Sequence, residues 1–177
     1  MAQTTSRRCI QPSATDTVTN TTSETAFART LKIPARSLQQ YNMLKFGGVT
    51  KHTATNSTDT FRIRAYIGTA KDNTGLLVAD SGALDVANDD CAAFNGWAMV
   101  KAQGGASALT LSGQSDSTQK TTDGGVAFSA TEAQLDGNAD LYLTVTCTQS
   151  AQSTGNVSRL DALWYELHPY DPELVAS

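Results

Sequence analysis

Histidine is the side chain best suited to proton transfer near neutral pH, and this chain has two, His52 and His168. A serine nucleophile needs a histidine that a carboxylate orients beside the hydroxyl, and no G-x-S-x-G turn marks such a serine. His52 follows Lys51 at the expected end of a strand, and His168 precedes Pro169. We therefore predict that both histidines lie at the surface and that the chain is not an enzyme, with no catalytic residue and no cofactor.

Cysteine and acidic side chains are the next candidates, because they can bind metal ions. The three cysteines are too far apart in the sequence for a metal motif: Cys9, Cys91 and Cys147. Residues 136–140 space three oxygens like the start of a calcium loop, but Leu141 stands where such a loop needs glycine. The acidic residues between 80 and 90 are more typical of a solvated loop. We expect no metal site, a tight turn at 136–140, and Cys147 as a buried free thiol.

Aromatic side chains offer a different chemistry, because a flat ring can stack on the apolar face of a sugar. Four are candidates: Tyr66, Trp97, Trp164 and Tyr165. They can bind carbohydrate only where they are exposed on one sheet, and aromatic residues of a β-sandwich more often belong to its core or to an oligomer interface. Carbohydrate binding is therefore kept as the alternative function.

The composition sets limits on the class of protein. The chain has 177 residues, enough for one domain with a substantial core, and only 17% of them are charged. A net charge of -4 implies no general affinity for nucleic acid. No apolar run approaches the roughly 20 residues that a membrane span needs. No hydrophobic segment follows Arg7 and Arg8, so we expect no secretory signal and no membrane partner.

Alternating apolar and polar residues predict strands along most of the chain. The clearest alternation runs from Phe61 to Ile67, and a similar one from Phe27 to Ile33 ends at Pro34. The Gly47-Gly48 pair is expected to form a bulge or bend. Eight to ten such segments, separated by turn residues, predict an all-β antiparallel β-sandwich of the jelly-roll type rather than an immunoglobulin sandwich.

Specific packing follows from this topology. In a jelly roll the first and last strands lie together, which would place Arg29 to Ile33 near Leu160 to Leu167. Four side chains are expected on inward faces: Phe61, Ile63, Leu143 and Val145. The segment from Arg159 to Leu167 is predicted as a strand, with a short helix as the alternative.

The N-terminal residues 1–22 are predicted to form an extended arm outside the sandwich, which would span 23–170 and precede a tail at 171–177. Their polar composition cannot bury enough apolar surface to offset the ordering entropy. We expect an arm that is mobile in isolation and contacts a partner through Arg7, Arg8 and Ile10.

The last strand carries large apolar side chains on both of its expected faces. An apolar face left uncovered on a soluble monomer favours aggregation, and a symmetric oligomer would cover it. The candidates for this interface are Leu163, Trp164, Tyr165 and Leu167.

Three segments resemble a family of jelly-roll structural proteins from the virions of tailed bacteriophages: TNTTSETAFARTLKIPARSL (19–38), DTFRIRAYIGT (59–69) and ALWYELHP (162–169). Members of that group include capsid cement or decoration proteins, head spikes and pieces of tail fibres. The family offers no catalytic residues to transfer, and the middle of the chain matches none of its motifs.

The resemblance implies a non-enzymatic protein, made in the bacterial host cytoplasm, that binds the major capsid protein on the capsid exterior as a homotrimer. The alternative is a carbohydrate-binding receptor module of a phage fibre or spike. An esterase or glycosidase is a weaker alternative, because no pair of facing carboxylates stands out.

Overall fold

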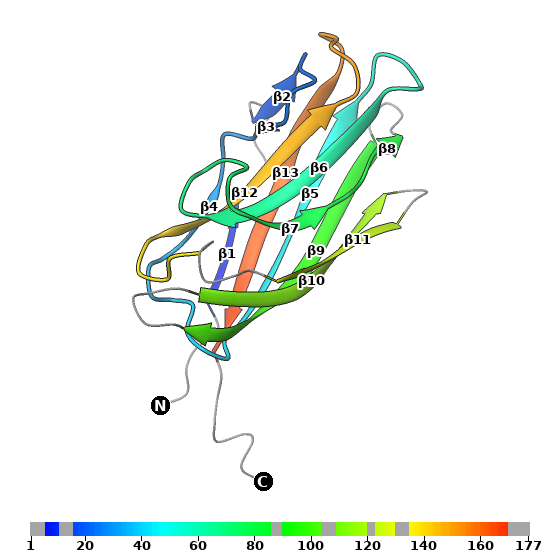
Figure 1. Ribbon diagram of the computed structural model, residues 1–177. Coiled ribbons are helices and arrows are strands. Elements are labelled where there is room, and N and C mark those ends of the chain that lie inside the picture. The colour runs from blue at the N-terminus through cyan, green and yellow to red at the C-terminus, as the bar shows by residue number, and fades with distance from the viewer. Residues whose placement is uncertain are drawn as a thin grey trace.

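The computed structural model describes residues 6–10, 16–85, 90–103, 109–119, 123–129 and 135–169. The described residues form strands and no helix, and every strand pairing among them is antiparallel. The strands form two sheets that pack face to face, as Figure 1 shows. This architecture confirms the predicted all-β antiparallel β-sandwich. In the same residues no helix is long and apolar enough to cross a membrane.

The seven-stranded sheet, called sheet A, has the strand order β1-β13-β5-β9-β10-β11, and β2 also pairs with β13. Its strands are β1 (Ser6–Ile10), β2 (Thr17–Thr19), β5 (Met43–Thr53), β9 (Asp90–Gln103), β10 (Leu109–Gln119), β11 (Asp123–Ser129) and β13 (Val157–His168).

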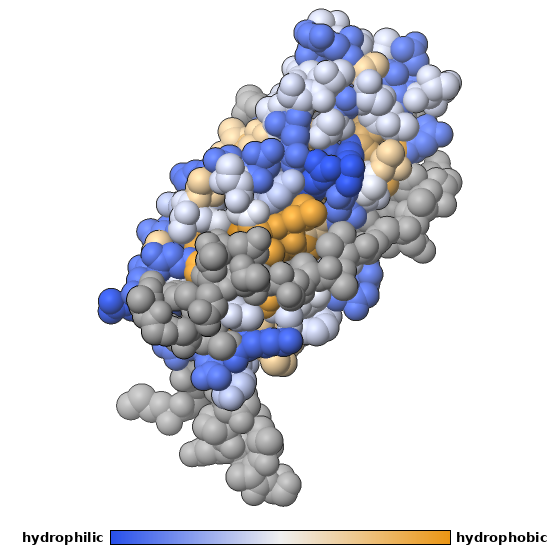
Figure 2. All heavy atoms as spheres, in the orientation of Figure 1, coloured by the Kyte–Doolittle hydropathy of each residue, from blue (hydrophilic) through white to orange (hydrophobic). Residues whose placement is uncertain are grey.

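The six-stranded sheet, called sheet B, has the order β3-β12-β6-β7, with β4 paired to β12 and β8 paired to β6. Its strands are β3 (Thr25–Ala26), β4 (Leu31–Ile33), β6 (Thr60–Gly68), β7 (Leu76–Asp80), β8 (Leu84–Asp85) and β12 (Leu141–Gln149). Sheet B lies toward the viewer in Figures 1 and 2, and this face is largely hydrophilic apart from a hydrophobic patch near its centre.

The core lies between the two sheets, where alternate side chains of each strand meet. The four side chains expected on inward faces are all buried: Phe61, Ile63, Leu143 and Val145. In β9 the alternation is as regular, since Ala98 and Val100 are buried while Trp97, Met99 and Lys101 point to solvent. The burial of Phe61, Ile63, Leu143 and Val145 confirms the prediction made from local alternation.

The last strand, β13, contains a bulge that the sequence pattern does not reveal. Leu160 pairs with Thr50 and Ala162 with Val49, so Asp161 is left as the extra residue. The bulge shifts the phase of the alternation, and Leu160 and Leu163 therefore point to the same inward side. Simple alternation predicts large apolar side chains on both faces of this strand. The bulge places most of them on the inward face. The helical alternative for this segment is wrong.

This phase shift corrects the predicted oligomer interface. Leu163, Tyr165 and Leu167 are buried in the sandwich core, so they cover sheet B rather than a neighbouring chain. Of the four candidates only Trp164 points away from the core, on the outer face of sheet A.

The N-terminal segment also differs from the predicted arm. Both β1 and β2 pair with β13, and Val18 is buried in the core. Asp16 is buried too, and its carboxylate accepts hydrogen bonds from the N–H of Ala28 at 2.8 Å and from Nε of Arg29 at 2.8 Å. The sandwich therefore begins by Asp16 rather than at residue 23. The first strands, β1 and β2, and the last strand, β13, lie together as expected.

The segment from Arg29 to Ile33 lies beside β12, because Leu31 to Ile33 pair with Leu141 to Leu143. It still reaches β13 through two hydrogen bonds. Arg29 Nη2 donates to the carbonyl of Leu160 at 2.7 Å, and the Tyr165 hydroxyl donates to the carbonyl of Lys32 at 3.0 Å. The expected proximity of Arg29 to Ile33 and the last strand is therefore present.

Candidate binding site

An open groove crosses the outer face of sheet A, the face directed away from sheet B. Its volume is about 550 Å³, and four adjacent strands, β13, β5, β9 and β10, supply its lining. The lining residues are Met43, Lys45, Asn95, Gly96, Trp97, Gln114, Asp116 and Trp164.

The strand register explains why these residues meet, since residues directly opposite each other in antiparallel strands project to the same face. In one row Trp164 pairs with Gly47, Gly47 with Asn95, and Asn95 with Asp116. In the next row Lys45 pairs with Trp97, and Trp97 with Gln114. Two neighbouring rows of the sheet therefore bring both tryptophans and four polar side chains to one place.

Gly47 sets the shape of the groove, because it has no side chain beneath its neighbours. A Cβ atom at this position would lie 2.7 Å from Cζ2 of Trp164 and 2.6 Å from Oδ1 of Asn95. The indole of Trp164 and the amide of Asn95 thus occupy the space above the glycine backbone. Any larger residue would have to displace one of them.

The groove combines apolar rings with polar groups of both kinds. Trp97 is 44% exposed, and Met99, beside the groove, is 41% exposed. The amides of Asn95 and Gln114 offer donors and acceptors, and the carboxylate of Asp116 offers acceptors. Such a surface can hold a ligand that has an apolar face and hydroxyl groups at its edge.

The structure separates the four aromatic candidates into two pairs. Trp97 and Trp164 lie in the groove, whereas Tyr66 and Tyr165 are buried. The sequence analysis missed the polar lining residues, which come from different strands and form no motif. One local pattern could have identified Asn95. It alternates in β9 with Trp97 and Met99, and all three side chains are exposed.

The residues predicted to contact a partner lie on the edge strand β1. Arg7 and Arg8 are exposed, and Nε of Arg7 lies 3.3 Å from Oε1 of Glu166 on β13. Ile10 is partly buried against the core, so it is less available than the two arginines.

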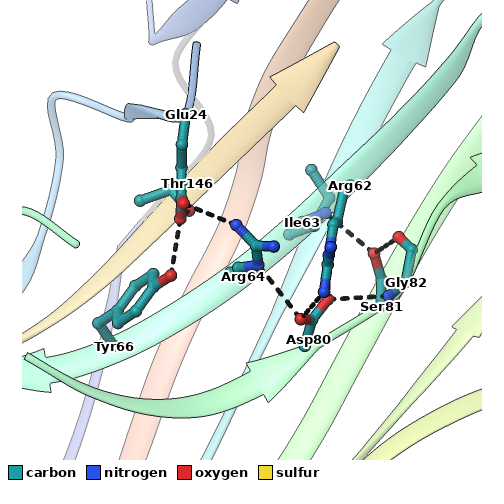
Figure 3. A network of polar contacts seen from close by, with 9 residues as sticks. All are labelled: Glu24, Arg62, Ile63, Arg64, Tyr66, Asp80, Ser81, Gly82 and Thr146. Carbon is teal, nitrogen blue, oxygen red and sulfur yellow. Dashed lines mark hydrogen bonds and ion pairs between the residues drawn. The ribbon is translucent and has the colours of Figure 1, made fainter. Parts of the chain in front are cut away.

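A polar network joins the strands of sheet B and involves the acidic residues Glu24 and Asp80 (Figure 3). The Glu24 carboxylate accepts hydrogen bonds from the hydroxyls of Tyr66 at 2.8 Å and Thr146 at 2.7 Å. Arg64 lies between the two acids, with Nη1 at 2.6 Å from Glu24 and Nε at 3.2 Å from Asp80. Arg62 also binds Asp80.

These contacts set the charge of the network. Burial acts to raise the pKa of Glu24, but the hydrogen bonds from Thr146 and Tyr66 and the charge of Arg64 hold it below 4.5. Burial and the bond to Glu24 raise the pKa of Tyr66 to about 12. Asp80 is ion-paired with Arg62 and Arg64. The described residues hold no cluster of three or more histidine, cysteine or acidic side chains placed to bind a metal.

His52 is buried, which corrects its predicted surface position. The Cys147 thiol donates a hydrogen bond to the hydroxyl of Ser158 at 3.0 Å. The same hydroxyl lies 3.0 Å from Nδ1 of His52. On the other side of the ring, Nε2 of His52 lies 2.8 Å from Oγ1 of Thr50. The Thr50 hydroxyl in turn donates to the carbonyl of Ala92. A His52 imidazole with its proton on Nε2 lets each of these groups donate to the next, from Cys147 to the carbonyl of Ala92.

This buried series of hydrogen bonds connects the two sheets and is structural rather than catalytic in character. Cys147 is a free, buried thiol, as predicted, and burial raises its pKa to about 12. The thiolate is the reactive form of cysteine, so Cys147 is unreactive near neutral pH. Its partners Ser158 and His52 are buried as well and do not line the groove.

The fold is a β-sandwich with an open groove on the outer face of one sheet. No model of a protein family matches the chain, and no curated protein matches it. Among solved structures it is similar to arcelin-5, a lectin-like defense protein from Phaseolus vulgaris, with a TM-score of 0.52 and 7% identity over 95% of this chain and 100% of that one.

Two further structures show weaker likeness. A seed lectin of Lotus tetragonolobus has a TM-score of 0.48 at 10% identity, covering 94% of this chain and 89% of that one. The VP2 protein of infectious bursal disease virus, in a subviral particle, has a TM-score of 0.42 at 8% identity, and the match covers 93% of this chain and 33% of that one. At such identities the likeness concerns the fold alone.

Proposed function

We propose that this chain is a non-enzymatic structural protein that binds the exterior of a phage capsid and cements or decorates it. The observation that carries this proposal is the composition of β1, a strand whose side chains contribute little to the fold. Ser6, Arg7, Arg8 and Cys9 are all exposed, although their backbone pairs with β13. Side chains presented in this way by a fixed backbone are available to a partner.

The sequence resemblance to virion proteins supplies the identity of that partner, the major capsid protein. The two arginines give β1 a positive charge on a chain whose net charge is -4. An acidic surface on the capsid protein would complement them. The chain acts as a homotrimer in this proposal, so that three β1 strands engage a repeating shell and their affinities reinforce one another.

Co-expression with the major capsid protein tests the proposal. Purified particles should contain the chain in hundreds of copies, as an estimate from the repeated shell of a capsid. The double variant R7A/R8A should lower this copy number, whereas K101A, which removes an exposed cation on β9, should leave it unchanged. Unaltered loading of R7A/R8A, or a total absence of the chain from particles, would contradict the proposal.

The second candidate is a carbohydrate-binding receptor module of a phage fibre or spike. It is favoured by the groove on sheet A, where two tryptophans and several polar side chains converge. In this case a particle would carry few copies, and the groove rather than β1 would contact the partner.

A further inference from the structure

We propose that the groove on the outer face of sheet A binds a neutral saccharide, with pyranose rings packed against Trp97 and Trp164. This inference rests on the second candidate function, names its ligand class and does not depend on capsid binding. It unites the two tryptophans, the amides of Asn95 and Gln114, and the carboxylate of Asp116.

The apolar part of the site is aromatic and is supported from below. Trp97 is 44% exposed, which leaves much of a large indole in water in the absence of a ligand. Trp164 is half-buried and is seated over Gly47, whose missing side chain gives the indole its place. A sugar ring has one face of C–H groups, and burying that face against an indole removes apolar surface of both partners from water.

The polar part of the site has the donors and acceptors that hydroxyl groups need. Asn95 and Asp116 are directly opposite each other on β9 and β10, and Gln114 is directly opposite Trp97. A hydroxyl both donates and accepts, an amide does the same, and a carboxylate accepts. Each of these polar side chains therefore lies next to a tryptophan or to another polar side chain. A single sugar ring can reach both members of such a pair.

The charge of the groove indicates a neutral ligand. Lys45 and Asp116 are the two charged residues of the lining, and their charges cancel. A phosphorylated or sialylated ligand would bring negative charge to a site with no excess of cations, on a chain with net charge -4. A neutral saccharide needs hydrogen bonds and no counter-ion.

The size of the groove also fits a small ligand better than a protein partner. Its volume of about 550 Å³ lies within the roughly 300–1,000 Å³ of small-molecule sites. A stable protein contact needs about 800 Å² from each partner, which is more than a groove lined by eight residues offers.

Titration calorimetry and tryptophan fluorescence on the purified full chain test the inference. The probes are the tetrasaccharides of glucose, N-acetylglucosamine, mannose and galactose, with sialyllactose as the acidic comparison. At least one neutral probe should bind and change the tryptophan emission, whereas sialyllactose should not. The W97A variant should raise the Kd about tenfold or more, because stacking on one ring is lost.

Two further variants sharpen the test. Y41A removes an aromatic side chain that is 51% exposed but lies outside the groove, so it should bind like the unaltered chain. Q114A should weaken binding and leave the chain folded, because Gln114 is exposed. Folding of each variant is checked by circular dichroism.

The inference is overturned if no neutral probe binds at millimolar concentration, if only sialyllactose binds, or if W97A and Y41A behave alike. It is also overturned if W97A changes the mass of the protein in light scattering, since the groove would then be a contact between chains. Adsorption of particles to host cells is measured in parallel. A chain that binds saccharide without aiding adsorption retains this inference and loses the receptor role.

Discussion

At the scale of single residues, the network around Glu24 and Asp80 makes the stability of the protein depend on pH. Burial acts to raise the pKa of Asp80, but Arg62, the N–H of Gly82 and Arg64 hold it below 3.8. A carboxylate whose pKa is lower in the folded than in the unfolded chain stabilises the fold when it is ionised. That stabilisation is present above the unfolded values of 4.5 for Glu24 and 3.8 for Asp80, and it is lost as the pH falls through the lowered folded values.

We therefore expect the D80N variant to be less stable than the unaltered protein at neutral pH and less sensitive to acid. The midpoint of urea unfolding, measured between pH of about 6 and about 3, should fall less steeply for D80N. E24Q should shift the slope in the same direction. If both variants keep the full acid dependence, the network does not control it.

The core gives a second expectation, at Leu143 on β12. Truncation to alanine at this fully buried position should lower the free energy of unfolding by about 2–5 kcal/mol, because it leaves a cavity. Leu77 on β7 is a matched control, since it is only partly buried and its truncation should cost less. Urea denaturation of both variants measures the difference. A loss below about 1 kcal/mol at Leu143 would mean that the core relaxes around it.

The sequence alone predicts the burial of Leu143 correctly, because that position depends on a local alternation. It fails for His52, whose partners Ser158 and Cys147 are supplied by strands about a hundred residues away. The sequence around His52 does not show that its side chain would find hydrogen-bond partners in the core. The groove is unpredictable for the same reason, because Trp97 and Trp164 meet through the pairing of three strands.

At the scale of elements, the bulge at Asp161 keeps the inward face of β13 continuous. Deletion of Asp161 would remove the extra residue and turn either Leu160 or the side chains after it toward solvent. We expect the deletion to cost about 2–5 kcal/mol, the usual loss for one buried leucine. The D161A substitution keeps the bulge and should cost far less. Thermal unfolding of the two variants compares them, and equal losses would assign the effect to the side chain of Asp161.

The two N-terminal strands should differ in their contribution to stability. Removal of residues 1–10 takes away β1, whose side chains are mostly exposed, and should leave a folded protein. Removal of residues 1–22 also takes away buried Val18 and the Asp16 bonds to Ala28 and Arg29. We expect the longer truncation to be less stable than the shorter one by at least about 2 kcal/mol in urea. Equal stability would restore residues 1–22 as an arm outside the sandwich.

These elements show where the prediction of strands stops. Alternation identifies β6 and β12, because each strand faces the core on one side only. A bulge changes the phase within a strand, and it becomes visible only in the pairing of β13 with β5. The polar composition of residues 1–22 conceals Val18, since a single buried residue has little effect on an average.

At the scale of the whole molecule, the assembly is the property to measure first. We expect a homotrimer, so light scattering should give a mass near three times the 18.7 kDa of one chain. The expectation rests on the resemblance to virion proteins, because the structure buries three of the four residues first proposed for the interface. A mass near one or two chains, stable on dilution, would discard the trimer and retain the binding surfaces.

Three glycines of sheet A, each beside an aromatic ring, have a consequence for how the chain can diverge. A side chain at Gly47 would collide with Trp164, one at Gly48 with Phe94, and one at Gly96 with Phe46. Neither partner of such a pair can change freely, because a larger residue at the glycine has room only if the ring becomes smaller. Among descendants of one ancestor these positions should therefore be inherited as pairs. A relative with alanine at position 47 should lack the tryptophan at position 164.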